Sequence, residues 1–263
     1  MKRLKNFFRG TYLGLMLIFL YAPILVLMVF SFNGSKSMAR WAGFSFKWYE
    51  ALMHDSTIMN ALIVTLSVAV ISALVATFIG TFAAIGIHSM KKRPRAVVEN
   101  ISRLPMVNPD LVTGISFMML FAALGIKGSY TRMLIAHITF NIPYVIIAVL
   151  PKLQNLNKHT MEAALDLGAT PLYTYWHVIL PQIKEGIFTG FLFAFTLSLD
   201  DFVISFFTTG SGVNNLAIVI YSMAKRGLNP KINAVLTLVF LAVIILLTIV
   251  SLRMNKDDNK SKN

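Results

Sequence analysis

The sequence predicts an all-α integral membrane protein with six transmembrane helices. Of its 263 residues, 56% are hydrophobic and only 13% are charged. A soluble domain has about 25% charged residues, so this chain has too few to cover a water-exposed surface. Uncharged runs long enough to cross the roughly 30 Å apolar core of a bilayer recur along the sequence. Its lysines and arginines also gather in alternate segments between these runs.

The expected spans follow from these runs, since about 20 apolar residues in a helix cross the bilayer core. The third run is the shortest, and it reaches full length only by starting near Pro105 and including Asp110. The fifth run contains Asp200 and Asp201. We expect one transmembrane domain over residues 1–263, with spans near 11–32, 58–88, 105–126, 132–151, 186–208 and 232–252.

The distribution of basic residues predicts the orientation, because cytoplasmic loops carry an excess of lysine and arginine. With the N-terminus inside, 16 of the 24 lysines and arginines lie on the cytoplasmic side. Both termini are therefore expected in the cytoplasm. The first span has 22 residues, longer than the apolar region of a usual signal peptide, and we expect it to be retained. This topology accounts for most of the net charge of +13, which disfavours nucleic-acid binding.

Motifs for chemistry are absent from the sequence. It contains no cysteine, which excludes disulfides and thiolate metal sites. No Walker A pattern occurs, so the chain cannot hydrolyse ATP itself. Neither a G-x-S-x-G nucleophile elbow nor an H-E-x-x-H metal motif is present. We therefore expect no catalytic residue, no metal and no cofactor in this chain.

The loop 152–185 is long enough to fold on the cytoplasmic side. Residues 157–167 favour a short helix, which Gly168 would end because glycine adopts a left-handed conformation without strain. Thr170 and Pro171 are typical of an N-cap and a first helical residue, so a second helix is expected there. Periodicity alone also permits an ordinary amphipathic interfacial loop.

The spacing within this loop resembles the EAA loop of ABC-importer permeases. Glu162-Ala163-Ala164 is followed after three residues by Gly168 and after nine more by Val178-x-Leu180-Pro181. The resemblance implies a type I ABC-importer fold, in which this loop docks in a groove of an ABC ATPase dimer that binds the ATP and magnesium. It also implies that Ala163 and Ala164 permit close approach, Gly168 sets the bend and Glu162 pairs with a basic group.

Asp200 and Asp201 are the least lipid-compatible residues of the expected spans. A carboxylate at the centre of a transmembrane helix costs roughly 2.5–3.5 kcal/mol on insertion scales, so such groups usually face a cavity or a partner. Neighbouring helical positions point about 100° apart, which disfavours both lining one pathway wall. A helix end, or pairing with a basic group of another subunit, is the alternative. A carboxylate-rich pathway would suit a cationic substrate.

Several short motifs, in order along the chain, resemble the second permease subunit of spermidine/putrescine ABC importers. That family implies a second permease, an ATPase dimer, an external polyamine-binding protein and a prokaryotic inner membrane. It implies substrate-pathway roles for Ser198, Asp200, Asp201 and Asp110, and stacking or docking outside for Trp48. The motifs are Lys47-Trp48-Tyr49, Asn108-Pro109-Asp110, His137-Ile138-Thr139-Phe140, Glu162 to Ala169, Ser198 to Ser205, Thr209-Gly210 and Ile220-Tyr221-Ser222.

Two other functions are alternatives to that of a polyamine permease. The same ABC machinery serves other solutes, such as another cation, an amino acid or a sugar, and only the neighbourhood of Asp200 and Asp201 separates these. The other is an intramembrane enzyme or an autonomous channel. The missing catalytic motifs argue against the enzyme, and a channel has no need of the loop signature.

Overall fold

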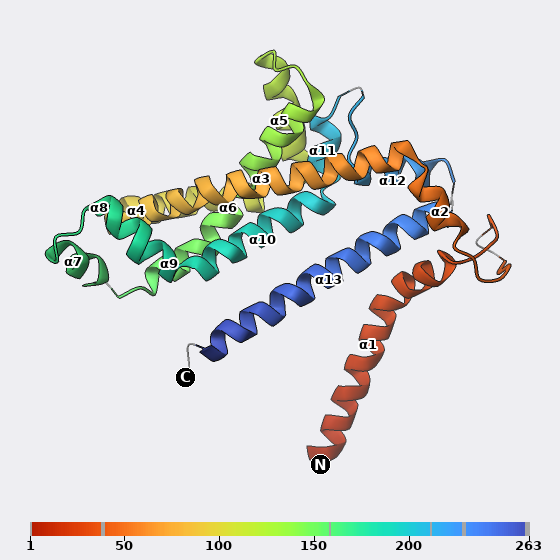
Figure 1. Cartoon of the computed structure of the whole chain (residues 1–263), viewed down its shortest axis with the longest axis horizontal. Coiled ribbons are helices and arrows are strands. Elements are labelled where there is room, and N and C mark those ends of the chain that lie inside the picture. The colour runs from red at the N-terminus through yellow and green to blue at the C-terminus, as the bar shows by residue number, and fades with distance from the viewer. Residues whose placement is uncertain (1, 38–39, 158, 211, 228–229, 261–263) are drawn as a thin grey trace. The chain divides into compact units, whose positions relative to one another are not determined.

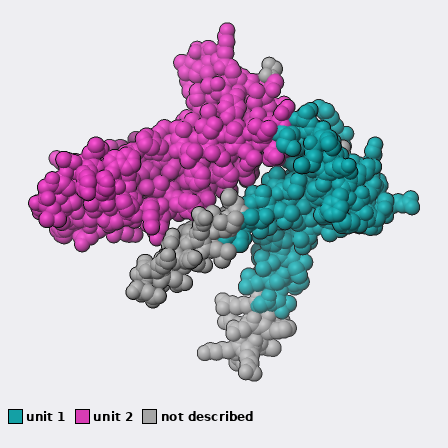
Figure 2. Space-filling model, in the orientation of Figure 1, with its two compact units in different colours: residues 1–59, 220–263 teal, residues 60–219 magenta. Residues whose placement is uncertain are grey.

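The computed structural model describes every residue except 1, 38–39, 158, 211, 228–229 and 261–263. The described residues form helices and loops, with one isolated β-bridge between Asn33 and Phe44. The chain divides into two compact units, residues 1–59 with 220–263 and residues 60–219 (Figure 2). Each unit is described by itself.

The first unit contains the chain's two terminal helices. α1 (Lys2–Phe30) and α13 (Pro230–Lys260) pack together, and α13 also packs on the short helix α2 (Lys47–Met53). Asp55, just after α2, forms an ion pair of 2.8 Å with Lys231 at the start of α13. This hydrogen-bonded ammonium holds the pKa of the Asp55 carboxyl below its usual range.

The second unit contains the long helices that carry the candidate site (Figure 1). Most of α3 and the start of α12 belong to it. In chain order its elements are α3 (Ser56–Ser89), α4 (Lys92–Val107), α5 (Asp110–Ala123), α6 (Ser129–Gln154), α7 (His159–Asp166), α8 (Pro171–Thr174), the π-helix η1 (Tyr175–Ile179), α9 (Leu180–Gln182), α10 (Lys184–Asp200), α11 (Val203–Thr208) and α12 (Leu216–Lys225).

The core of the second unit lies where α6 meets α3 and α10. Small residues let the backbones approach closely, as is usual between membrane helices. An added Cβ at Gly80 on α3 would come within 2.7 Å of Val145, and one at Gly190 on α10 within 3.1 Å of the same side chain. Gly186 meets α6 one turn further along. These contacts fix how α3 and α10 lie against α6.

Within the described part of the chain, three helices are long and apolar enough to cross a membrane, namely Gly10–Phe30, Ser56–Ser89 and Ser129–Gln154. Counting each bent helix pair as one span gives up to five among the described residues. The apolar part of α13 is described over Pro230–Ile245, and most side chains after Ile245 lie outside the described residues. The protein is therefore a multi-pass, all-helical chain, and the count of six spans stays a prediction.

Two of the expected spans are not continuous helices. The expected third span, 105–126, crosses a bend of 98° between α4 and α5. Pro109 explains this bend, since a proline disfavours the helical conformation of the preceding residue, and Asn108 has ψ 135°. The expected fifth span, 186–208, is interrupted where α10 ends at Asp200 and α11 begins at Val203.

Candidate functional site

The acidic pair lies at the break between α10 and α11. Asp200 is the last residue of α10, and Asp201 leaves the helix with an extended backbone (ψ 123°). The two side chains have different surroundings, because Asp200 is exposed whereas the side chain of Asp201 is only 10% exposed. The sequence left open whether the acidic pair lies at a helix end, and in the structure α10 ends at Asp200.

Asp201 caps the helix that follows it. Its Oδ1 accepts a hydrogen bond from the Ile204 amide at 3.2 Å, and its Oδ2 accepts one from the Ser205 amide at 2.7 Å. A carboxylate is stabilised at this position because the first amides of a helix have no partner within it. His137 of α6 places its Nε2 3.5 Å from Oδ2. Asp201 is thus held by the protein's own groups.

A buried polar cluster surrounds this cap. The Nε2 of His137 lies 2.9 Å from the Ser205 hydroxyl, to which the Asn215 side chain also donates at 2.8 Å. The same Asn215 amide donates to the Asp201 carbonyl, and its Oδ1 accepts from the Ile218 amide. Next to it, the Leu216 amide donates to Thr65 of α3 at 2.7 Å. The cluster therefore connects α3, α6, α11 and the start of α12.

Ser198 lies on α10 two residues before Asp200, and its side chain is buried between helices. Its hydroxyl accepts a hydrogen bond from Asn141 of α6 at 2.7 Å and lies 3.0 Å from Ser72 of α3. Ser198 is 1% exposed, and its expected role in the substrate pathway stays a prediction. Its observed contacts connect three helices just below the break.

Trp48 is also buried in its own unit. Its side chain is 5% exposed, and its indole N–H donates to the Asn33 carbonyl at 2.6 Å. The ring is covered within the segment that follows α1, and the ammonium of Lys47 lies 5.3 Å from its centroid. Trp48 therefore shapes the segment around Asn33. The expected stacking or docking role of Trp48 stays a prediction.

Asp110 is exposed as the first residue of α5, where an acid suits the N-terminus of a helix. Beside it, the concave side of the α4–α5 bend forms a hollow whose lining includes the polar side chains of Asn108, Thr113, Ser116 and Thr139. Of the five expected pathway residues, Ser198, Asp200 and Asp201 thus lie together at the end of α10. Asp110 lies on another helix of the same unit and Trp48 in the other unit.

The segment α7–α9 folds as the sequence predicts. α7 ends before Gly168, which has a φ of +85°. The Leu167 amide donates to Ala163 and the Ala169 amide to Ala164, which closes the helix end. Thr170 then accepts from the Tyr173 amide at 3.3 Å as the N-cap of α8. Two helices meet at a sharp glycine bend.

This segment exposes several apolar side chains. Leu167, beside the bend, is 88% exposed, and Leu172, Tyr173 and Trp176 are also exposed. A hollow at the bend is lined by Ala164, Leu167, Gly168, Ala169, Thr170, Tyr173 and Val178. Exposed Glu162 lies beside it on α7, 2.9 Å from the ring of His159. A segment that protrudes with uncovered apolar side chains marks a surface for interaction.

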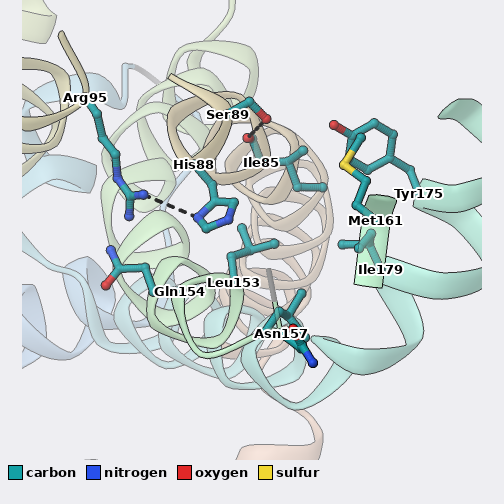
Figure 3. A pocket seen from close by; sticks show the side chains of 11 residues that line it. Ile85, His88, Ser89, Arg95, Leu153, Gln154, Asn157, Met161, Tyr175 and Ile179 are labelled. Carbon is teal, nitrogen blue, oxygen red and sulfur yellow. Dashed lines mark hydrogen bonds between the residues drawn. The ribbon is translucent and has the colours of Figure 1, made fainter. Parts of the chain in front are cut away.

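The base of the segment is joined to the long helices. Ile179 and Ile183 belong to the core with α3, α6 and α10, and Met161 and Tyr175 pack against that core. A small cavity of about 220 Å³ lies beside these residues (Figure 3). His88 and Arg95 line its other side, with Arg95 also paired to Glu99 at 2.7 Å. A force on the segment would therefore reach α3 and α6.

The sequence did not identify most of the buried cluster. His137 entered only as part of a motif, and Thr65, Asn141 and Asn215 did not enter at all. Their common signal is a polar side chain within an apolar run, which marks a buried contact but not its partner. Among the residues that the structure describes, no group of three or more histidine, aspartate or glutamate side chains is placed to hold a metal ion.

The model of the family described as "Binding-protein-dependent transport system inner membrane component" matches residues 76–256. The chain belongs to this family. It is 40% identical over 233 residues to the putrescine transport system permease protein PotI of Escherichia coli (strain K12), covering 86% of this chain and 83% of PotI. It is 36% identical over 252 residues to the spermidine/putrescine transport system permease protein PotC of the same strain, covering 96% and 95%. The resemblance drawn from the sequence motifs is confirmed.

Solved structures of ABC transporters share the fold of this inner membrane component. A chain of a bacterial ABC transporter involved in import of the acidic polysaccharide alginate superposes with a TM-score of 0.68 at 17% identity, covering 97% of this chain and 99% of that one. A chain of an amino acid ABC transporter gives a TM-score of 0.57 at 21% identity, covering 78% and 98%. At these identities the likeness shows the fold alone.

Proposed function

We propose that this chain is a permease subunit of an ATP-driven importer of polyamines. The observation that carries the proposal is its similarity, over most of its length, to PotI and PotC. In this proposal it forms the translocation pathway with a second permease in a prokaryotic inner membrane, with both termini in the cytoplasm. An external polyamine-binding protein delivers the substrate.

Asp200 is the pathway carboxylate in this proposal. It is exposed at the end of α10 and makes no ion pair or hydrogen bond with another described residue. A polyamine carries several ammonium groups, and charge-assisted hydrogen bonds to a carboxylate are about twice as strong as neutral ones. Asp110, exposed at the start of α5, is a second point of attraction. Asp201 and Ser198 support the break, and Trp48 shapes the external segment.

The energy enters through the segment α7–α9. The ABC ATPase dimer binds ATP and magnesium, since this sequence has no Walker A pattern. Leu167 and the hollow at Gly168 offer it an apolar surface, while Glu162 offers a charge. Closure of the dimer moves the segment, and Ile179 transmits that movement to the helix core. The pathway between the two permeases then opens to the other side.

Uptake of labelled putrescine and spermidine tests this function, in cells that lack other polyamine importers and express the complete transporter. Asp200→Asn should reduce uptake at subsaturating substrate by about tenfold, the loss of one charged hydrogen bond, with assembly unchanged. Glu50→Gln, at an exposed acid of α2, is the matched control and should transport normally.

Two outcomes would contradict the proposal in different ways. Uptake of an amino acid or a sugar in place of polyamines would retain the permease and replace its substrate. Full polyamine uptake by Asp200→Asn would remove Asp200 from the pathway while leaving the substrate in place.

A further inference from the structure

The break between α10 and α11 contains a local cap, since Asp201 accepts from the Ile204 and Ser205 amides, but no residue that breaks a helix by its own backbone. Residues Leu199 to Ser205 include neither proline nor glycine, the two residues that end helices through their own backbone. The apolar residues around the acids favour continuation of the helix instead. Contacts with His137 and Asn215 therefore add to the local cap in holding the chain in its broken form.

His137 provides the contact that comes from α6. It is 1% exposed, although an ionisable side chain is rarely buried in a membrane helix without a specific purpose. Its Nε2 lies between the Ser205 hydroxyl and the Asp201 carboxylate, at 2.9 and 3.5 Å. Its Nδ1 has no hydrogen-bond partner among the described residues. These contacts assign the proton to Nε2, because a buried donor without a partner is rarer than such an acceptor.

Asp201 is then surrounded by donors. The amides of Ile204 and Ser205 donate to its two oxygens, and the Nε2 of His137, bonded to the Ser205 hydroxyl, lies 3.5 Å from Oδ2. Asn215 completes the arrangement by binding both the Asp201 carbonyl and the Ser205 hydroxyl. The charge of Asp201 is therefore compensated without a cation, and it has little to offer a substrate.

The two neighbouring aspartates thus have different roles. If α10 continued through residue 203, the next helical turn would follow directly on Asp200, and both acids would be helical residues about 100° apart. The break instead turns Asp201 inward and leaves Asp200 as the exposed end of α10.

We infer that His137 is a positioning residue for transport, which holds Asp201 in the helix break and thereby presents Asp200, and not Asp201, to the substrate. The inference rests on the proposed function for its substrate, but the arrangement itself is a property of this chain. Its contacts are specific to the side chain, because Ser205 and Asp201 both bind the same imidazole nitrogen.

Labelling of a thiol at position 200 tests the arrangement without any substrate. The chain has no cysteine, so Asp200→Cys introduces its single thiol, and labelling is read on this chain after separation from its partner subunits. In the complete transporter in membranes, a cationic methanethiosulfonate should label Asp200→Cys readily. Adding His137→Ala should slow the labelling by about tenfold, as expected when a buried hydrogen-bonded group is lost. Adding His137→Gln, which retains a side-chain N–H donor, should restore most of the rate.

Removal of an exposed imidazole, His54→Ala, is the matched control and should leave the labelling rate unchanged. An unchanged or increased rate with His137→Ala would overturn the inference. So would equal slowing by His137→Ala and His137→Gln, because the donor would then not matter.

Polyamine uptake provides the second readout. His137→Ala should raise the KM by about tenfold, and in an Asp200→Asn background it should add little, because both changes remove the same carboxylate from the pathway. Effects that multiply would overturn the inference. If the proposed substrate is wrong, the unaltered transporter will take up no polyamine. The labelling rates of the Asp200→Cys variants will nevertheless follow the expected pattern.

Discussion

The bend at Gly168 and the break at Asp201 redirect the chain of the same compact unit by opposite means. At Gly168 the hydrogen bonds among the described residues are local: amides bond to carbonyls three to five residues back, and Thr170 accepts from the amide three residues after it. At Asp201 two local cap bonds are joined by contacts to His137 and Asn215, from distant parts of the sequence. The first redirection is encoded in its own residues, whereas the second exists only in the folded chain.

The surfaces differ in the same way. The segment around Gly168 exposes Leu167 and Trp176, which we propose that the ATPase covers. The break buries His137 and Ser205 and exposes a single charge, that of Asp200. One region is therefore suited to transmit force from a partner, and the other to hold a charge in place. The comparison predicts that damage at the bend disconnects the motor, while damage at the break weakens binding or the fold.

Reversal of the charge at Glu162 should have the largest effect. Glu162→Arg places a cation on the exposed face of α7, where we propose that a basic group of the ATPase docks. We expect polyamine uptake to be abolished while the ATPase activity of the isolated motor stays intact. Glu50→Arg reverses an equally exposed acid on α2 and should transport normally. Normal uptake by Glu162→Arg would remove this residue from the coupling surface.

A smaller effect should follow from a methyl group at Gly168. Its φ of +85° costs an ordinary residue about 1–2 kcal/mol, although an added Cβ would meet nothing within 4 Å. Gly168→Ala should therefore lower uptake by about fivefold as the bend relaxes. Gly125→Ala imposes similar strain at a φ of +63°, also in open space, but in the loop after α5. Equal losses in transport for the two variants would show that the bend has no specific role.

The bend could be predicted from the sequence because its causes are neighbours. Gly168, Thr170 and Pro171 each impose a backbone preference on their own position, and the structure contains each feature where it was expected. The long apolar helices α3 and α6 were predicted for a similar reason, since composition alone fixes them. Sequence patterns of this kind need no knowledge of the tertiary fold.

The break could not be predicted, because hydropathy registers only that residues 186–208 are apolar enough for a span. The partners that hold Asp201 lie 64 residues before it and 14 residues after it, at His137 and Asn215. From the sequence, both acids are energetically costly in lipid, and a helix end is one explanation for their presence in a span. The sequence offered no means to distinguish Asp200 from Asp201, because that difference arises from what packs around them.

The smallest effect should come from the contact that connects three helices just before the break. Asn141→Ala removes the bond to Ser198 from a site that is fully buried, but it also removes an Oδ1 without a partner among the described residues. Hydrogen bonds between membrane helices contribute about 0.6 kcal/mol on average, so we expect a destabilisation of about that size. Thermal unfolding of the purified transporter in detergent would measure it.

Thr139→Ala on the same helix is the control for this contact. Its hydroxyl is exposed and bonds only back to Ile135 of its own helix, so no change in unfolding is expected. Combining Asn141→Ala with Ser198→Ala should cost less than the sum of the two single changes, since residues that share a hydrogen bond do not act independently. Additive effects would mean that the α6–α10 bond does not stabilise the helices next to the break. The exposed charge of Asp200 would then depend on the His137 cluster alone.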